Sequence, residues 1–319
     1  IKGEMGTGAN ASVLVIARGA TIKAAGTAAA PIVFTSVADE IELGQKVGSN
    51  LNARTDKGFW GGVIILGNAP VSPKTGTTEQ VEGIPADVIE GNYGGDDAAD
   101  NSGVFTYVSI RHGGTLIGEG NEVNGLTLGG VGTGSTINHI EVVGNVDDGI
   151  ECFGGTVNID DAIVLYQGDD AFDIDQGYSG TIDNFIYIAG PTSDHGLEID
   201  GPEGSASGTH TITNGTTYAG RAQGLVDLDD NSSLVFKNQY FFGLADGQDF
   251  DQVPTDDGFL NASDFQVTLP AGGFLTDFFK DGSDAFTSEV SEGANTVGAN
   301  ASVFTGWPWA GLSGNLSGI

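Results

Sequence analysis

The stretch from residue 125 to residue 230 repeats one short acidic phrase, as DDGIE at 147–151, DDAFDID at 169–175, DHGLEID at 194–200 and GLVDLDD at 224–230. A small residue anchors each copy and recurs at intervals of 24, 22, 25 and 28 residues, at Gly125, Gly149, Ala171, Gly196 and Gly224. A period in the twenties, filled with strand-like triplets and Gly, Asn or Asp corners, is typical of a solenoid in which each repeat forms one turn.

Apolar and acidic residues alternate within each copy, as they do in a strand that has one buried face. The alternation directs seven apolar side chains inward, namely Ile150, Phe172, Ile174, Leu197, Ile199, Val226 and Leu228. Further apolar runs between the copies predict additional strands at residues 104–110, 137–143, 159–165, 182–188, 210–213 and 234–236. The pattern therefore predicts an all-β fold, a right-handed parallel β-helix with about 22–28 residues per turn.

The N-terminal part shows the same strand and corner pattern with longer interruptions. Short apolar runs at residues 12–17, 20–24 and 32–35 predict one turn of a β-helix with three faces. Two polar stretches, residues 37–58 and 70–102, predict long inserted loops.

The acidic phrase disappears after residue 245, and the composition of the chain changes. Aromatic clusters follow instead, FLTDFF at 274–279 and WPW at 307–309. Solenoids need atypical ends that cover their exposed strands. We therefore expect a β-helix over residues 1–245 and an irregular, aromatic-rich cap over residues 246–319.

The charge of the chain is extreme, with 43 acidic and 11 basic residues and a net charge of -32. Such a surface repels nucleic acid, so no nucleic-acid partner is expected. No run approaches the roughly 18 apolar residues of a membrane-spanning helix, so membrane insertion is not expected either. The single cysteine, Cys152, lies in a strand and is expected to be a small core residue.

The outward carboxylates are expected to stack, because equivalent positions of neighbouring turns lie about 4.8 Å apart. Stacked like charges repel, and calcium, which accepts 6–8 oxygen ligands, is the natural counterion. We therefore predict calcium sites among the outward and corner residues Asp148, Glu151, Asp170, Asp173, Asp175, Glu198, Asp200, Asp227 and Asp229. Two alternatives stay open, a solvated acidic face and a catalytic carboxylate cluster. No loop matches the EF-hand calcium pattern, so the prediction depends on stacking alone.

An enzyme must be weighed against a binding or structural protein. Hydrolysis of a glycosidic bond needs carboxylates about 5–9.5 Å apart, which the acidic phrase could supply. A catalytic site is normally unique, however, whereas this phrase recurs on several turns. The chain has only four arginines, and neither Arg111 nor Arg221 lies in a visible cluster of basic residues that would hold an anionic sugar. We assign no catalytic residues and favour a role without catalysis.

Several segments are similar to a family of secreted parallel β-helix proteins with a pectate-lyase-like fold, found in Bacteroidetes and in marine and soil bacteria. They are FWGGVIILGNAP at 59–70, VEGIP at 81–85, DNSGV at 100–104, NGLTLGGVG at 124–132 and DDGIECFGGTV at 147–157. The resemblance covers residues 1–240 and implies a β-helix and export, with an extracellular or cell-surface location. Members of this family carry further strands before the point where this chain starts, and the family supplies no catalytic residues.

The leading functional prediction is an exported structural or adhesive module at the cell surface, stabilised by calcium. An unpaired parallel strand at the end of a solenoid can accept another copy, so end-to-end assembly into fibres is part of this prediction. The alternative is a β-helix that binds or degrades polysaccharide. The expected partner is therefore a second copy of the chain or a surface polysaccharide.

Overall fold

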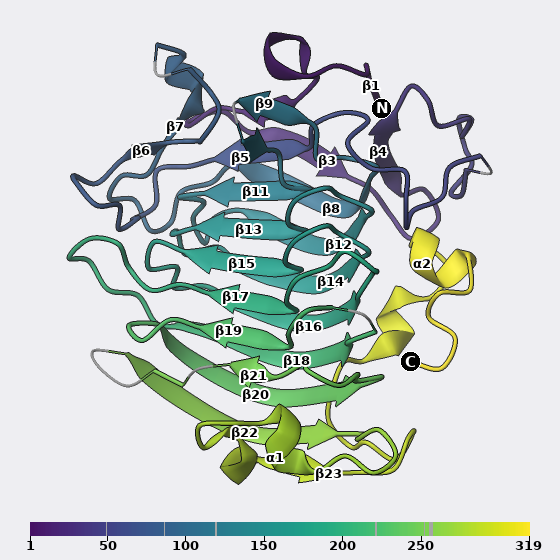
Figure 1. Cartoon of the computed structure of the whole chain (residues 1–319). Coiled ribbons are helices and arrows are strands. Elements are labelled where there is room, and N and C mark those ends of the chain that lie inside the picture. The colour runs from purple at the N-terminus through teal and green to yellow at the C-terminus, as the bar shows by residue number, and fades with distance from the viewer. Residues whose placement is uncertain (49, 86, 119, 221, 252, 255–257) are drawn as a thin grey trace.

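The computed structural model is a parallel β-helix whose strands stack in two large sheets (Figure 1). It describes the chain except residues 49, 86, 119, 221, 252 and 255–257. The predicted fold class is confirmed. The short-strand sheet runs in the order β2 (Leu14–Ile16), β5 (Val63–Leu66), β11 (Leu126–Gly129), β13 (Ile150–Phe153), β15 (Phe172–Asp175), β17 (Leu197–Ile199), β19 (Val226–Leu228) and β21 (Phe250–Asp251).

The long-strand sheet forms the second wall of the coil. Its strands run in the order β1 (Lys2–Gly3), β4 (Ile32–Ser36), β8 (Gly103–Arg111), β12 (Thr136–Val143), β14 (Ile159–Leu165), β16 (Thr181–Ile188), β18 (His210–Tyr218), β20 (Ser233–Phe242), β22 (Phe259–Val267) and β23 (Thr287–Glu289). Strand β3 (Ile22–Ala25) also pairs with β8. Every described pair in both sheets is parallel, whereas two small hairpins, β6 (Glu79–Gln80) with β7 (Asn92–Tyr93) and β9 (Leu116–Gly118) with β10 (Asn121–Glu122), are antiparallel.

Each long strand bends at one residue in the left-handed region, which gives the coil its third face. The φ angles of these residues lie between 51° and 63°, at Tyr107, His139, Asp161, Asn184, Asn214, Asn238 and Asp264. Asn, Asp and His tolerate this conformation better than most residues. Strands β3 and β4 pair with β8 on either side of Tyr107, so the predicted three-faced first turn is confirmed.

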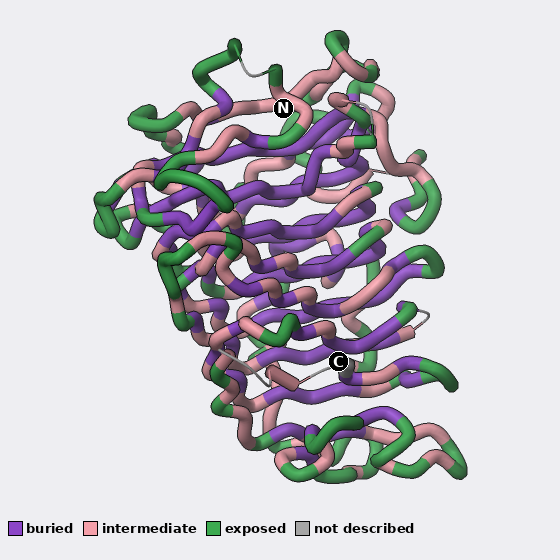
Figure 2. The backbone as a smooth tube through the Cα atoms, turned by 60° about the vertical axis from the view of Figure 1, so that its left-hand side comes forward, coloured by how far each residue is buried: buried purple, intermediate pink, exposed green. Residues whose placement is uncertain are grey.

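The register explains the repeat and corrects one copy of it. The β11, β13, β15 and β17 partners Leu126, Ile150, Phe172 and Leu197 follow one another at 24 and then 22 and 25 residues. Leu197 pairs with Val226, so the anchor position of the next coil is Leu225, not Gly224 as the sequence suggests. The seven side chains predicted to point inward are all buried. Figure 2 shows that buried residues run along the stacked rungs of the coil.

At the coil of β13 the anchor residue must be small, because it faces the inner side of the long-strand sheet. A Cβ at Gly149 would collide with the side chain of Val164 and lie 2.6 Å from the Ala171 carbonyl oxygen. Gly149→Ala is therefore expected to destabilise the protein by about 1–3 kcal/mol, as overpacked core positions do. Urea unfolding checks this, with Ala171→Gly as a comparison expected to cost less than about 1 kcal/mol. An unchanged unfolding midpoint for Gly149→Ala would contradict the packing argument.

The predicted boundary at residue 245 does not mark the end of the coil, because β21, β22 and β23 continue both sheets. The far end carries α1 (Leu275–Phe278) and η3 (Ser283–Phe286) beside β23. Residues 299–319, here termed the strap, contain η4 (Ala301–Phe304) and α2 (Trp309–Leu312) and run along the side of the coil (Figure 1).

The strap covers an apolar patch on the outer face of the long-strand sheet. Trp307 is fully buried against a group of residues from β12, β14 and β16, namely Val143, Ile163, Leu165 and Ile186. The inserted loops lie near the N-terminal end, and the second contains η2 (Ile89–Gly91) and the β6–β7 hairpin. The element η1 (Gly8–Asn10) and the β9–β10 hairpin lie outside both predicted loops. Among the described residues, none of the helices has the length and apolar character needed to cross a bilayer.

Candidate functional site: an acidic cleft

A cleft of about 350 Å³ lies over the short-strand sheet, where β11, β13, β15 and β17 present their outward side chains. Its far wall comes from the β9–β10 hairpin, through Ile117, Asn121 and Glu122, and from the second inserted loop, through Glu82. No lysine or arginine of the described part of the chain lines this cleft. The cleft is therefore acidic, and sequence reasoning did not foresee the hairpin that forms one of its walls.

The floor of the cleft is a row of outward side chains in register. Thr127 pairs with Glu151, Glu151 with Asp173, Asp173 with Glu198, and Glu198 with Asp227. The predicted first row is thus confirmed as an alignment of strand positions. The second row begins at Asp175, which pairs with Phe153, and continues through Asp200 and Asp229.

A further column of polar residues lines the corner before each short strand. It consists of Asn124, Asp148, Asp170 and His195, which precede β11, β13, β15 and β17. The Asp170 backbone N–H donates to Asp148 Oδ1 over 2.9 Å, and the His195 backbone N–H donates to Asp170 Oδ1 over 2.5 Å. Each carboxylate therefore ties its corner to the next coil.

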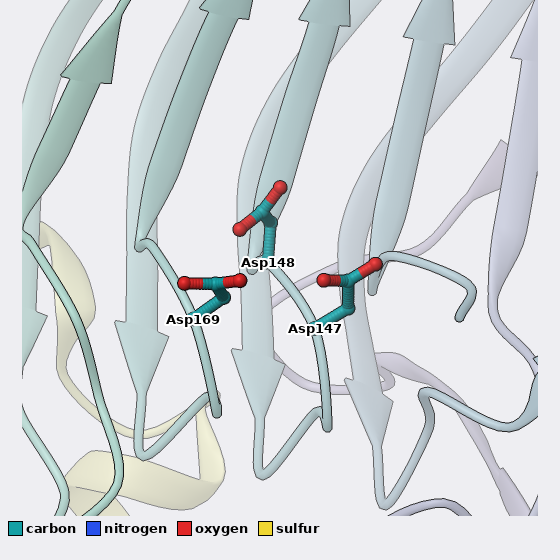
Figure 3. Close-up of side chains that lie close together, drawn as sticks. All are labelled: Asp147, Asp148 and Asp169. Carbon is teal, nitrogen blue, oxygen red and sulfur yellow. The ribbon is translucent and has the colours of Figure 1, made fainter. Parts of the chain in front are cut away.

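Two groups of carboxylates come close enough to share a cation. In the first, ligand oxygens of Asp148, Glu151 and Asp173 lie within 4.8 Å of one another. In the second, Asp147 and Asp169 flank Asp148 at the same spacing, from the corners of two neighbouring coils (Figure 3). Asp148 belongs to both groups and is the residue that joins them.

Burial and mutual repulsion hold protons on this cluster in the absence of a counterion. Burial, with repulsion from Glu151, raises the pKa of Asp148 well above its usual range. Burial and neighbouring carboxylates do the same to the pKa of Glu151 and of Asp173. At the mouth of the cleft, burial and the Asp169 carboxylate raise the pKa of Asp147 to about 6.

Asp170 and Glu198 behave differently, because they share a hydrogen bond. That bond, together with burial, raises the pKa of Glu198 to about 9. Burial opposes ionisation of Asp170, but hydrogen bonds from His195 and Glu198 outweigh it and lower the Asp170 pKa. His195 Nδ1 lies 3.4 Å from Asp170 Oδ1 and 3.2 Å from Asp194 Oδ1. Asp170 therefore interacts with the His195 imidazole and the Glu198 carboxyl, and it is not part of the group formed by Asp148, Glu151 and Asp173.

A buried amide oxygen adds to the donor set of the cleft. The Asn124 side chain is 7% exposed, and its Oδ1 has no hydrogen-bond partner among the described residues. Its Nδ2 donates to Glu151 and, over 3.3 Å, to Thr127 Oγ1. Asp173 Oδ1 is likewise buried without a partner. Oxygen atoms that lack a donor cost free energy when buried, and a cation would satisfy them.

The predicted ligands thus fall into separate groups. Asp148, Glu151 and Asp173 are brought together, whereas the other six lie along the rows or beside His195. The predicted set of ligands did not include Asp147, Asp169, Asn124 or Glu122. Asn124 directly precedes the Gly125 anchor, as Asp148 precedes the Gly149 anchor. This equivalence was the signal in the sequence that could have identified Asn124.

These features define a class, a parallel β-helix with an acidic cleft over its short-strand sheet. Residues 1–269 match the family model described as the pectate-lyase-like beta helix domain, and the chain belongs to this family. Searches of curated proteins and of solved structures gave no match to the chain.

Proposed function

We propose that the acidic cleft binds calcium and that the protein uses this cleft to bind polysaccharide. The observation that supports the proposal most strongly is the group of Asp148, Glu151 and Asp173 beside the unpaired Asn124 carbonyl. Every donor atom is an oxygen, which favours calcium over softer metals. Three carboxylates and one amide supply up to seven oxygens, and calcium takes 6–8.

The shape and charge of the cleft support a carbohydrate ligand. Ionised carboxylates accept charge-assisted hydrogen bonds from sugar hydroxyls. The carboxylates of a uronic polysaccharide would be repelled by the floor of the cleft unless a cation lay between them. Membership in a family whose description refers to pectate lyase adds support for a polysaccharide ligand. A calcium ion at Asp148, Glu151 and Asp173 would supply attraction for such a ligand.

The same cation would stiffen the coil, because its ligands come from the neighbouring coils of β13 and β15. This keeps the structural or adhesive role at the cell surface as a second candidate. Export and end-to-end assembly remain predictions. Electron microscopy at high protein concentration with calcium tests the assembly, and a stable monomer would contradict it.

Glu151→Gln is expected to weaken calcium binding at least about tenfold, because it removes one charged ligand from a hydrogen-bonded cluster. Isothermal titration calorimetry of calcium in two buffers with different ionisation enthalpies provides the measurement. Calcium must displace protons from the cluster, so the apparent enthalpy should differ between the buffers.

The matched control is Glu289→Gln, which makes the same change at an exposed position of β23. It is expected to bind calcium like the unaltered protein. Equal affinity of the two variants, or wild-type protein that binds no calcium at millimolar concentration, would refute the proposed cation site.

A further inference from the structure

A second cleft, of about 430 Å³, lies beside the corners that follow β16 and β18. It is lined by Arg54 from the first inserted loop and by corner residues, namely Ala189, Gly190, Pro191, Tyr218 and Gly220. Unlike the acidic cleft, this one contains no carboxylate among its described lining residues. A cationic side chain and an aromatic ring therefore face one space in a chain whose net charge is -32.

Arg54 is held by an aromatic ring rather than by an acid. Its guanidinium lies 4.1 Å from the centroid of the Tyr166 ring, and Nη2 donates to the Tyr166 hydroxyl over 3.0 Å. That hydroxyl donates in turn to Asn315 Oδ1 in the strap, over 2.5 Å. The ion pairs found among the described residues all involve other side chains. The positive charge of Arg54 is thus oriented but not neutralised.

Lys57 adds a second cation at the margin of the cleft. Its Nζ donates to Thr192 Oγ1 over 3.1 Å, and Thr192 follows the lining residue Pro191. Thr192 is exposed at the surface, whereas Lys57 is half-buried. Arg54 and Lys57 therefore approach the cleft from one loop, three residues apart.

Tyr218 provides a fixed and partly exposed ring. Gly220 and Gly243 lie against the ring, and both have positive φ angles, 52° and 69°. A Cβ at Gly220 would lie 3.1 Å from the ring, and one at Gly243 would collide with it. The ring also packs on Phe242, with centroids 5.2 Å apart. Rings of this kind present an apolar body and a polar tip to a ligand.

We propose that this cleft binds an acidic saccharide, with the anionic group on Arg54 and the sugar face on Tyr218. A guanidinium fork matches the two oxygens of a carboxylate or a sulfate, which a neutral sugar lacks. Surface charges farther away than about 8 Å are largely screened at physiological ionic strength, so the local cations decide the attraction. The site involves none of the acidic-cleft residues and stands independently of the calcium proposal.

The test is the binding of three tetrasaccharides, one of galacturonate, one of sulfated galactose and one of neutral galactose, measured by calorimetry. EDTA is present throughout, so that binding bridged by calcium at the acidic cleft is removed. The acidic tetrasaccharides are expected to bind at least about tenfold more tightly than the neutral one, since charge-assisted bonds are the stronger ones. The acidic probe that binds more tightly shows whether the site prefers a carboxylate or a sulfate.

Arg54→Gln is expected to abolish the preference for acidic over neutral tetrasaccharides. Arg54→Lys is expected to retain only part of that preference, because lysine lacks the planar fork of the guanidinium. Lys57→Gln serves as the second variant if loss of the Tyr166 contact unfolds the Arg54 variants, and it is expected to weaken acidic probes only. Lys23→Gln removes the same charge from an exposed position on β3 and should bind like the wild type.

Two results would overturn the proposal, equal binding of acidic and neutral probes by the wild type or unchanged binding by both Arg54→Gln and Lys57→Gln. Calcium titration of the same variants separates the two sites. Loss of saccharide binding with unchanged calcium affinity supports an independent anion site.

Discussion

Metal-free protein is expected to lose stability as the pH rises from about 5 to about 9, and calcium is expected to restore it. The folded-state pKa is raised to about 6 for Asp147 and Asp200, to about 7 for Asp175 and to about 9 for Glu198. A raised carboxyl pKa means that the folded protein binds more protons than the unfolded chain between the two pKa values. Stability therefore falls with rising pH across that window.

The expected loss is large because several groups act together. One pKa unit corresponds to about 1.4 kcal/mol, and screening of these partly exposed groups reduces the sum to on the order of 3 kcal/mol. In a protein of this size such a loss lowers the melting temperature by roughly 5 °C or more. Thermal unfolding in EDTA at pH 5, 7 and 9 measures it.

Calcium should reverse this trend because it binds the ionised carboxylates. A concentration of 100 times the dissociation constant stabilises the folded state by about 2.7 kcal/mol. The increase in melting temperature should be largest at pH 9 and smallest at pH 5, where protons occupy the cluster. Sodium chloride of matched ionic strength controls for screening. Stability that rises with pH in EDTA, or an equal response to both salts, would contradict this account.

Glu141→Ala is expected to destabilise the protein by about 3–5 kcal/mol, because it leaves a buried arginine without its partner. Glu141 is fully buried and lies 3.8 Å from Arg111, which is itself only 2% exposed. It also accepts hydrogen bonds from Ser109 at 2.5 Å and from the strap backbone N–H groups of Trp309 and Ala310 at 2.9 and 2.8 Å. The substitution thus breaks both an ion pair and the attachment of the strap.

Urea unfolding measures the loss, and limited proteolysis shows whether the strap is released. Glu141→Gln is expected to cost less, because its amide oxygen still accepts from the backbone. Glu289→Ala, at an exposed position, controls for the loss of a glutamate. A strap that stays protected from protease in Glu141→Ala would refute the role of this carboxylate.

The coil and its acidic rows could be predicted because both depend on local pattern. Alternation over five to seven residues sets which side chains point outward, and the repeat period places them in register on neighbouring coils. The row from Glu151 to Asp227 therefore followed from the spacing of the phrase. The exception is the coil anchored at Leu225 rather than Gly224. A coil that is one residue longer has nearly the same composition, so the sequence pattern did not reveal the shift.

The remainder of the cleft depends on contacts that a repeat does not encode. Asn124 occupies the same column as Asp148 but carries no charge, so an acidic pattern does not include it. The β9–β10 hairpin lies in a loop whose path is set by packing on the coil. The strap is attached to Glu141 through two residues that lie 168 and 169 positions further along the chain, and no periodic pattern predicts a contact at that separation. The pattern predicted both Asp170 and Glu198 as calcium ligands and did not predict the hydrogen bond between them.

The position of the strap has a consequence for biosynthesis. Coils of a solenoid contact only their neighbours, so they can fold one after another as the ribosome delivers them. The apolar patch on β12, β14 and β16 must nevertheless stay uncovered until Trp307 emerges. At about 5–20 residues per second this interval lasts roughly 10–30 s, long enough for a chaperone to bind the nascent chain. Emergence of the strap thus ends the period in which this patch of the growing protein is exposed to aggregation.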